Sequence, residues 1–335
     1  MRPVFKPLLA TAGVGVVALA LAAARGAPTV ERVDFNTVRT ATTPAYDALL
    51  KPASKADIKE FIIPITHDTI EISTGVKYEG WTFGGTVPGP TIRVREGDLV
   101  RIKAVNKSPM PHSIDFHSAR IPANVAYRML VPNDTISFEF VARDPGAYLV
   151  HCGTPPITMH MMQGMYLAII VDPKGGWPTK ADKEFVLVQS EFYAKNDSLG
   201  RAVPDWNAAM DKKASQVVFN GRAFQYKDTP LRVDEGDNVR FFVVNAGPTF
   251  RSDFHIVGAI FDRAYPDGNP ANALERVQTV TVPAGGGMVF ESRFEKGQSG
   301  EGLYPFVTHS FADAEKGAVG IIQVGTPKQY AKMAH

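Results

Sequence analysis

The single cysteine of this chain lies in a short segment that also holds two histidines and a methionine. In HCGTPPITMHMMQGM, Cys152 directly follows His151, His160 lies eight residues after the cysteine, and Met165 lies five residues beyond His160. Two imidazoles, one thiolate and a weak thioether are the ligands of blue-copper electron-transfer sites, whose soft sulfur donors stabilise Cu(I). The compact spacing lets one loop wrap a single ion. It therefore predicts a copper site that uses Cys152, His160 and Met165.

The methionine and the cysteine each leave an alternative open. Met161 and Met162 are rivals for the methionine position, but Met165 is favoured because it opens the apolar run YLAIIV and can point back towards the ion. The cysteine has no partner for an internal disulfide, and an exposed thiol is a liability in an exported protein. Cys152 is therefore either a metal ligand or a buried, inert side chain.

A second histidine-rich segment, HSIDFH, is expected to form a strand that complements AYLVHC. Successive side chains of a strand face opposite ways, so Cys152 and His151 must lie on opposite faces. The same rule predicts one face with His112, Ile114 and Phe116, and another with Ser113, Asp115 and His117. The candidate ligands thus divide into an inner set, containing His112, Cys152, His160 and Met165, and an outer set, containing His117, His151 and Asp115.

The outer set has only two histidines, and His309 is the natural third because FVTHS resembles YLVHC. Three histidines and an open position make a catalytic metal site with room for water or substrate. Unrelated surface histidines are one alternative; a zinc hydrolase is another, although it gives the inner set no purpose. A second Asp-Phe-His places His255 in the other half of the chain. His255 either delivers protons together with Asp115 or is a hydrogen-bonded core histidine.

An internal repeat accounts for the two Asp-Phe-His motifs. VREGDLVRIKAVN (residues 94–106) and VDEGDNVRFFVVN (residues 233–245) match at eight of thirteen positions. Short runs such as TISFEF and YLAIIV, separated by Gly, Pro, Asn and Asp, are typical of antiparallel sandwiches or barrels, and helix signals are sparse. We expect an all-β protein with two domains at residues 60–172 and 183–326, joined by a linker at residues 173–182.

The composition and the ends of the chain narrow the class of protein. Residues 1–27 carry Arg2 and Lys6 before an apolar run, which predicts a cleaved export signal and a periplasmic location; an uncleaved anchor is the alternative. The formal net charge of +2 gives no electrostatic reason to expect nucleic-acid binding. An N-terminal arm at residues 28–59 and a tail at residues 327–335 carry no signal beyond possible contacts between subunits. His67 and His335 are interpreted as structural or tail residues.

Taken together, these motifs resemble those of two-domain copper-containing nitrite reductases. The likeness rests on GTVPGPTIRVREGD, PHSIDFH, VHCGTPPITMHMMQGM, SDFHIVGAIFDRAY and YPFVTHSFADAEKGAVG, and it runs from about residue 60 to residue 326. The resemblance implies two tandem cupredoxin-like Greek-key β-sandwich domains assembled as a homotrimer. It implies one type 1 copper per subunit on His112, Cys152, His160 and Met165, and one type 2 copper on His117, His151 and His309. In this family the last histidine comes from a neighbouring subunit.

The same resemblance implies an activity and a role for further residues. The reaction is the one-electron, two-proton reduction of nitrite to nitric oxide and water, with the electron passing from type 1 to type 2 copper through the peptide link between Cys152 and His151. Asp115 and His255 match the catalytic acid and base positions. Val257 stands where the family often has a bulkier isoleucine, and Gln278 and Thr279 fall near a segment that orients the catalytic histidine. The donor is a separate protein, a c-type cytochrome or a small cupredoxin, because the chain has no CxxCH motif.

Two competing functions remain at this stage. A multicopper oxidase shares the repeated domains, but its trinuclear cluster needs several His-X-His pairs, and this sequence has none. An electron-transfer cupredoxin without catalysis would use the inner set alone. A single domain would suffice for that function, so the second domain and His309 argue against it.

Overall fold

The computed structural model describes residues 27–37, 46–296 and 300–326. The predicted export signal therefore lies outside the described residues except for Ala27, and so do the C-terminal tail with His335 and residues 38–45 of the arm. Within the described residues, no helix has the length and the apolar character needed to cross a bilayer.

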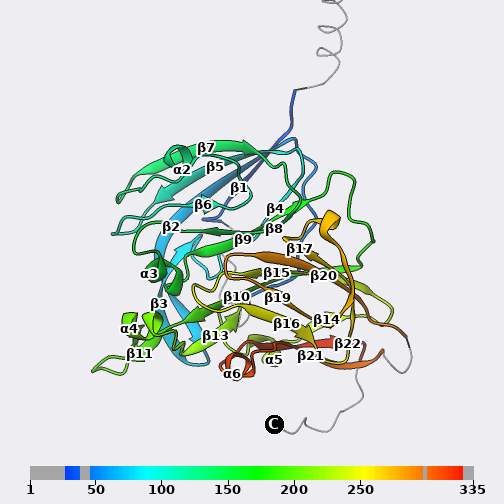
Figure 1. The fold of residues 1–335 in the computed structure, drawn as a ribbon. Coiled ribbons are helices and arrows are strands. Elements are labelled where there is room, and N and C mark those ends of the chain that lie inside the picture. Colours follow the sequence, from blue (N-terminus) through cyan, green and yellow to red (C-terminus); the bar gives the residue numbers. More distant parts are fainter. Residues whose placement is uncertain (1–26, 38–45, 297–299, 327–335) are drawn as a thin grey trace, which may run out of the picture.

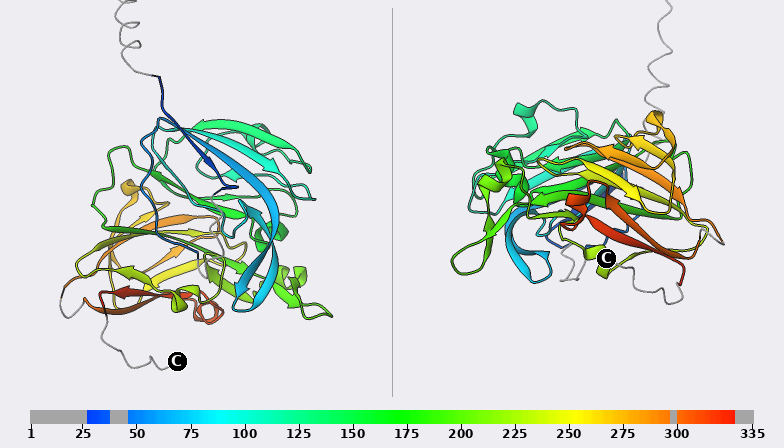
Figure 2. Two further views of the ribbon diagram at one scale, coloured as in Figure 1. Left: turned by 180° about the vertical axis from the view of Figure 1, so that it is seen from behind. Right: turned by 60° about the horizontal axis from the view of Figure 1, so that its bottom comes forward.

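The described residues form an all-β structure, as predicted, in which four sheets stack as successive layers (Figures 1 and 2). The two sheets of the first sandwich come mainly from the first half of the chain. Its outer sheet contains β1 (Val30–Asp34), β2 (Ile58–Ser73), β3 (Val76–Phe83), β5 (Leu99–Asn106), β7 (Thr135–Val141), β11 (Ala194–Asn196) and β12 (Ala202–Pro204). Its inner sheet contains β4 (Ile92–Arg95), β6 (Asp115–Phe116), β8 (Gly146–His151) and β9 (Tyr166–Asp172).

The second sandwich repeats this arrangement further along the chain. Its inner sheet contains β10 (Lys183–Phe192), β13 (Gln216–Phe219), β15 (Asn238–Asn245), β17 (Phe261–Pro266), β18 (Leu274–Val277) and β20 (Gly287–Arg293). Its outer sheet contains β14 (Leu231–Val233), β16 (Ser252–Ile256), β19 (Thr279–Val282), β21 (Gly302–Thr308) and β22 (Val319–Val324). The helices are short: α2 (Ala123–Ala126), α3 (Ile157–Met162), α4 (Trp206–Met210), α5 (Gln225–Asp228), α6 (Phe311–Ala314) and the 3-10 turn η1 (Pro270–Asn272).

The two copies of the repeat occupy equivalent places in the two sandwiches. In the first copy β5 pairs in parallel with β2 and antiparallel with β7, and in the second β15 pairs in the same senses with β10 and β20. The copies differ where their surroundings differ. In β5 the buried Ile102 and Ala104 flank Lys103, whose side chain is exposed, whereas the corresponding residues of β15 are all buried.

Three apolar clusters fill the spaces between the four layers. One packs within the first sandwich, one within the second, and the third joins the inner sheets of the two sandwiches. Strand β9 lies between two of these clusters, with Leu167, Ile169 and Val171 on one side and Tyr166, Ala168 and Ile170 on the other. The uninterrupted run YLAIIV therefore reflects a strand that is buried on both faces.

The backbones of the two sandwiches approach closely. The Ala147 amide donates to the Asp267 carbonyl at 3.0 Å. A methyl group added at Gly287 would lie 2.0 Å from the Ala147 carbonyl oxygen, so glycine is required there by the close packing of β20 on β8. The fused sandwiches hold β8, the strand that carries His151, between layers of both domains.

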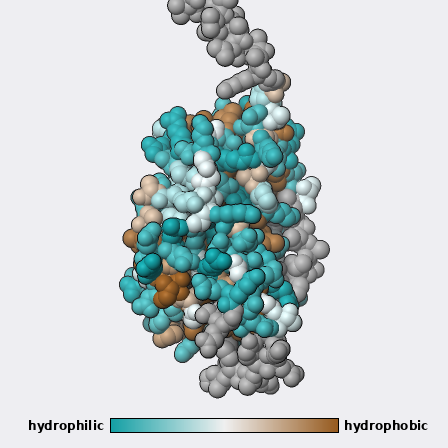
Figure 3. Space-filling model, turned by 90° about the vertical axis from the view of Figure 1, so that its right-hand side faces the viewer, coloured by the Kyte–Doolittle hydropathy of each residue, from teal (hydrophilic) through white to brown (hydrophobic). Residues whose placement is uncertain are grey.

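Two segments extend the first sandwich in ways that the sequence did not indicate. The arm residues of β1 pair in parallel with β2. Residues of β11 and β12 follow the first strand of the second sandwich, yet Ala202 pairs with Tyr78 of β3 in the first. The side of the molecule in Figure 3 is largely hydrophilic with separate hydrophobic patches, as expected for the outward faces of such sheets.

Candidate metal centre

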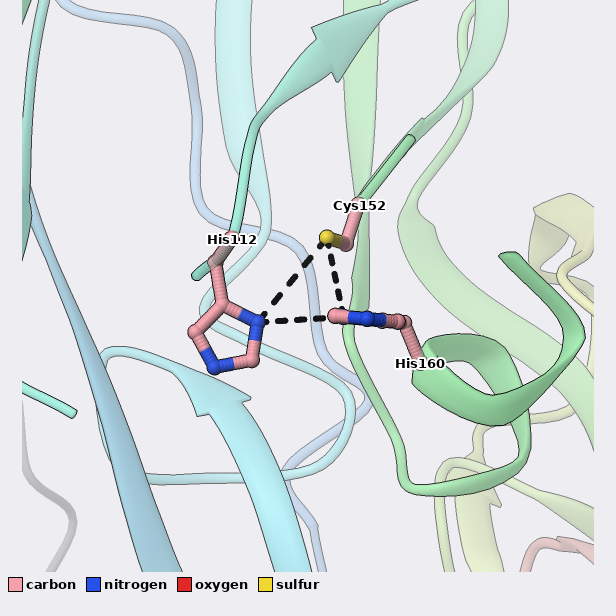
Figure 4. Close-up of side chains that lie close together, drawn as sticks. All are labelled: His112, Cys152 and His160. Atoms are coloured by element: carbon pink, nitrogen blue, oxygen red, sulfur yellow. Dashed lines mark hydrogen bonds between the residues drawn. The ribbon is translucent and has the colours of Figure 1, made fainter. Parts of the chain in front are cut away.

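The inner set is brought together by three separate segments (Figure 4). His112 forms an isolated bridge with Leu130, Cys152 follows the last residue of β8, and His160 lies in α3. The Nδ1 atoms of the two histidines are 3.0 Å apart, and Cys152 Sγ lies 3.2 Å from His160 Nδ1 and 4.0 Å from His112 Nδ1. All three side chains are buried. The three donor atoms thus converge on one point below the surface.

Electrostatics keeps the two imidazoles of the inner set in the form that ligates metal. Burial, followed by the neighbouring His160, lowers the pKa of His112 to about 3. Burial also lowers the pKa of His160 to about 4. Both rings are therefore neutral near pH 7, with lone pairs available, as a metal ligand requires. A buried thiol and two neutral imidazoles form a donor set suited to copper or zinc, and not to hard cations.

Ser113 supports the cysteine, in a place that the sequence did not predict. Its amide points at Cys152 Sγ at 3.3 Å, and its hydroxyl accepts a hydrogen bond from the Gly153 amide at 2.9 Å. The expectation that Ser113 shares a face with Asp115 and His117 is wrong, because Ser113 is buried beside the cysteine. The reason is that β6 contains only Asp115 and Phe116, so strand alternation does not extend back to Ser113.

Met165 lies where α3 gives way to β9. Its carbonyl accepts from the Cys152 amide at 3.1 Å, and its own amide donates to the His160 carbonyl at 3.2 Å. Its side chain is buried in the same apolar cluster as Cys152, whereas Met161 and Met162 belong to the other two clusters. Of the three methionines, Met165 is therefore the one packed with the inner set.

The outer set gathers on the other side of β8. His117 Nε2 lies 3.0 Å from His151 Nε2, and Asp115 Oδ2 lies 3.7 Å from the same atom of His151. Asp115 pairs with His151 in the register of β6 and β8. The Asp115 and His151 side chains are 30% and 15% exposed, respectively. Unlike the inner set, this group is open to solvent, and a small molecule could reach it.

His117 is exposed, and Gly285 of the second sandwich lies near its ring, since a Cβ at Gly285 would be 3.7 Å from His117 Cε1. Desolvation, followed by the nearby His151, lowers the pKa of His117, while Asp115 and a backbone contact at Gly285 act in the opposite direction. The second ring nitrogen of His151, Nδ1, lies 2.9 Å from the Cys152 carbonyl oxygen. That contact orients His151 with Nε2 facing His117 and Asp115.

Within one chain, the structure does not bring His309 to the outer set. His309 follows β21, and its ring centroid lies 5.5 Å from that of His255 on β16. The groups of metal-ligating side chains found among the described residues are His112 with Cys152 and His160, and Asp115 with His117 and His151. His309 and His255 therefore form a pair of their own on the second sandwich.

His255 is oriented by the segment that the sequence had marked only weakly. Its Nδ1 lies 2.7 Å from the Gln278 carbonyl oxygen, which fixes Nδ1 as the donor and leaves Nε2 free to exchange a proton. Val257, Ile260 and Phe311 on the same sandwich are exposed, at 47%, 55% and 61%. The His255 and His309 pair thus lies in a region with several exposed apolar side chains.

His67, which was interpreted as structural, contacts a residue of the inner set. Its Nε2 lies 3.1 Å from His112 Nε2, and its ring stacks on Trp81 with centroids 5.0 Å apart. His67 is paired with Trp81 across β2 and β3, and it lies 45 residues before His112 in the chain. No short-range pattern in the sequence could have indicated this contact.

The chain is similar to known copper proteins over most of its length. The family model for multicopper oxidases matches residues 64–176. The copper-containing nitrite reductase of Neisseria gonorrhoeae is 40% identical over 263 residues, which cover 76% of this chain and 66% of that protein. The corresponding protein of Cereibacter sphaeroides is 30% identical over 296 residues, which cover 81% of this chain and 78% of that protein.

A solved structure of copper nitrite reductase from Nitrosomonas europaea superposes with a TM-score of 0.73 at 35% identity, covering 80% of this chain and 94% of that one. The fold and the paired ligand sets define a two-domain protein of the cupredoxin class. Within that class, the chain belongs to the copper-containing nitrite reductase family. It spans about two thirds of the length of the Neisseria relatives.

Proposed function

We propose that this protein is a dissimilatory nitrite reductase that converts nitrite, one electron and two protons to nitric oxide and one water. The observation that carries the proposal is the peptide bond between His151 and Cys152, which joins the open outer set to the buried inner set. An enclosed thiolate site suits electron storage, and an open histidine site suits the binding of a small anion. The relatives named above are copper-containing nitrite reductases by name.

Copper fits the donor atoms of both sets. The inner set, with neutral imidazoles, a buried sulfur and Met165 in the same cluster, matches a type 1 site. His117 and His151 of the outer set, completed by His309 of a second copy, would hold a type 2 ion. When bound, copper supplies a one-electron redox centre at the inner set and a Lewis acid with an exchangeable position at the outer set.

Asp115 and His255 are the residues that would hold and deliver the two protons. Asp115 Oδ2 lies 3.7 Å from His151 Nε2, so the carboxyl group borders the position where a ligand of the outer set would sit. His255 presents Nε2, because Nδ1 is engaged by the Gln278 carbonyl. A carboxylic acid and an imidazole positioned beside a reacting anion can act as a pair of general acids.

The complete site requires a second copy of the chain, and we assign the assembly as a homotrimer. His309 and His255 lie on the second sandwich, apart from His117 and His151 of the same chain. Contact between the second sandwich of one copy and the first sandwich of the next would cover exposed Val257, Ile260 and Phe311. Head-to-tail contacts of this kind generate a closed ring when the rotation between copies allows it.

The remaining parts of the proposal concern the donor and the location. A soluble c-type cytochrome or small cupredoxin is the proposed electron donor, since the proposed reaction consumes one electron for each nitrite. The apolar run after Arg2 and Lys6 supports export to the periplasm.

Subunit complementation tests the shared site. His117→Ala and His309→Ala should each abolish nitric oxide formation from nitrite by reduced protein, because each removes one of three ligands. When the two variants are produced together in equal amounts, about three quarters of randomly assembled trimers are mixed, and each mixed ring holds one intact interface of three. The whole population should therefore regain about a quarter of the wild-type sites. Full activity of His309→Ala alone, or a mixture that stays inactive although mixed trimers are isolated, would overturn the shared site.

A further inference from the structure

His67 contacts the inner set from the side opposite to Cys152. The Nδ1 atom of His112 faces Cys152 Sγ and His160 Nδ1, while its Nε2 atom faces His67 Nε2 at 3.1 Å. The two nitrogens of the His112 ring are therefore used for different purposes. One is directed at the metal position and the other at a single neighbouring side chain.

This arrangement determines where the proton of His112 lies. A neutral imidazole carries one proton, and the nitrogen that ligates a metal must be free of it. His112 therefore carries its proton on Nε2 and donates it to His67 Nε2. His67 must then hold its own proton on Nδ1, and that atom lies 3.6 Å from Glu79 Oε1. The resulting row of groups is Glu79, His67 and His112, with every proton pointing outwards from the metal position.

The surroundings hold the His67 ring in this orientation. It stacks on Trp81 at an interplanar angle of 8°, and its side chain is only 13% exposed. Trp81 in turn packs edge-on against His112 and His160, with centroids 5.4 and 4.9 Å apart. Because His67 and Trp81 are paired across β2 and β3, the hairpin fixes both rings relative to the inner set.

We infer that His67 is a positioning residue for the type 1 copper, acting through His112. By accepting the His112 Nε2–H, it fixes the tautomer and the ring orientation of His112 and increases the electron density on Nδ1. A stronger nitrogen donor favours Cu(II) over Cu(I), so His67 lowers the reduction potential of the site. The inference rests on the proposed binding of copper by His112, and it concerns a contact that neither the ligand set nor the catalytic pair requires.

Two variants separate the hydrogen bond from packing. His67→Phe keeps a flat ring for Trp81 but cannot accept a proton, whereas His67→Gln keeps an acceptor oxygen. Loss of such an outer contact weakens metal binding by about tenfold. If the affinity for Cu(II) falls tenfold and the affinity for Cu(I) does not change, the reduction potential of copper-loaded His67→Phe rises by about 59 mV, the value of a tenfold change for one electron. His67→Gln should recover most of the wild-type potential. Glu71→Gln, further along β2 and paired with Arg222, is the matched control and should show no shift.

A second readout uses the metal-free protein and needs no nitrite. Nitrogen-15 NMR of the imidazoles should show the His112 proton on Nε2 in wild type and a loss of that preference in His67→Phe. An unchanged potential and an unchanged His112 tautomer in His67→Phe would overturn the inference, and so would an equal shift in His67→Gln. A protein that binds copper and shows these shifts but forms no nitric oxide would instead contradict the proposed function alone.

Discussion

His151 and Cys152 are neighbours in the chain but belong to different sites. The ring of His151 faces His117 and Asp115 at the open side of β8, and the thiol of Cys152 faces His112 and His160 in the apolar interior. Strand geometry enforces this separation, because consecutive side chains point to opposite faces. One peptide bond is therefore the shortest covalent path between a buried site and an open one.

Cys152→Ser should separate the two sites functionally. The hydroxyl is a much weaker copper ligand than the thiolate, so the intense visible absorption of the inner copper should disappear, while the outer site still binds copper. Nitric oxide formation with an external protein as electron donor should fall by about 100-fold or more. Loss of a residue that only contacts a metal ligand already lowers activity by up to about 100-fold, and Cys152 is itself a proposed ligand. Absorption spectra, metal analysis and turnover check this. Undiminished turnover with an empty inner site would contradict the path through Cys152.

Asp115→Asn should slow turnover by about 100-fold or more, because it removes a positioned general acid and keeps the volume of the side chain. Asp144→Asn is the matched control: Asp144 forms a surface ion pair with Arg120, and both side chains line a hollow beside His117. The control should retain nearly full activity, since an exposed ion pair contributes little to the stability of the fold. Nitric oxide production across the pH range measures both. Equal losses in the two variants would point to a general effect of surface charge.

Glu191 should make the second sandwich sensitive to pH. Burial raises the pKa of this carboxyl to about 7, although the Phe250 and Thr249 amides and Tyr193 lower it in part. A raised pKa means that the folded state holds the proton more tightly. The contribution of protonated Glu191 to the free energy of unfolding is therefore fully present below about pH 4.5 and is lost as the pH rises through about 7. The loss amounts to about 3 kcal/mol.

Glu191→Gln removes this titration. Its free energy of unfolding, relative to wild type, should rise by about 3 kcal/mol between pH 4.5 and pH 8 in urea titrations. Glu275→Gln changes an exposed carboxylate of the same sandwich and should give a nearly constant difference. A pH-independent difference between Glu191→Gln and wild type would show that folding does not raise the pKa of Glu191.

Gly287→Ala should loosen the contact between the two sandwiches. The added methyl group would lie 2.0 Å from the Ala147 carbonyl oxygen, so strands β20 and β8 must separate. The cost of such overpacking is about 1–3 kcal/mol, or more where backbone has to move. Gly175→Ala in the linker meets no atom within 4 Å and serves as the control. Thermal unfolding compares the two, and equal stability would contradict a tight interface at Gly287.

The sequence predicted those features that depend on local alternation. In β7, Ile136 and Phe140 are buried while Ser137 and Glu139 are exposed, as the pattern of TISFEF indicates. The division of His151 and Cys152 between two faces follows from the same rule. Ser113 was misplaced because the rule was applied beyond the two residues of β6.

Features that depend on long-range register could not be read from the sequence. The His67 contact requires the pairing of β2 with β3 and a further approach to His112, and the pairing of Ala202 with Tyr78 joins segments from the two halves of the chain. The place of His309 is of the same kind. Within one chain its ring lies beside that of His255, which follows from the pairing of β16 with β21.

Each chain is proposed to hold a buried redox site and to supply His117 and His151 to an open site that binds nitrite. Electron paramagnetic resonance of the oxidised, copper-loaded protein tests it directly, before and after nitrite is added. We expect two Cu(II) signals, of which only the one with the wide copper hyperfine splitting shifts with nitrite. A single type 1 signal that does not respond to nitrite would contradict it and would leave an electron carrier as the function.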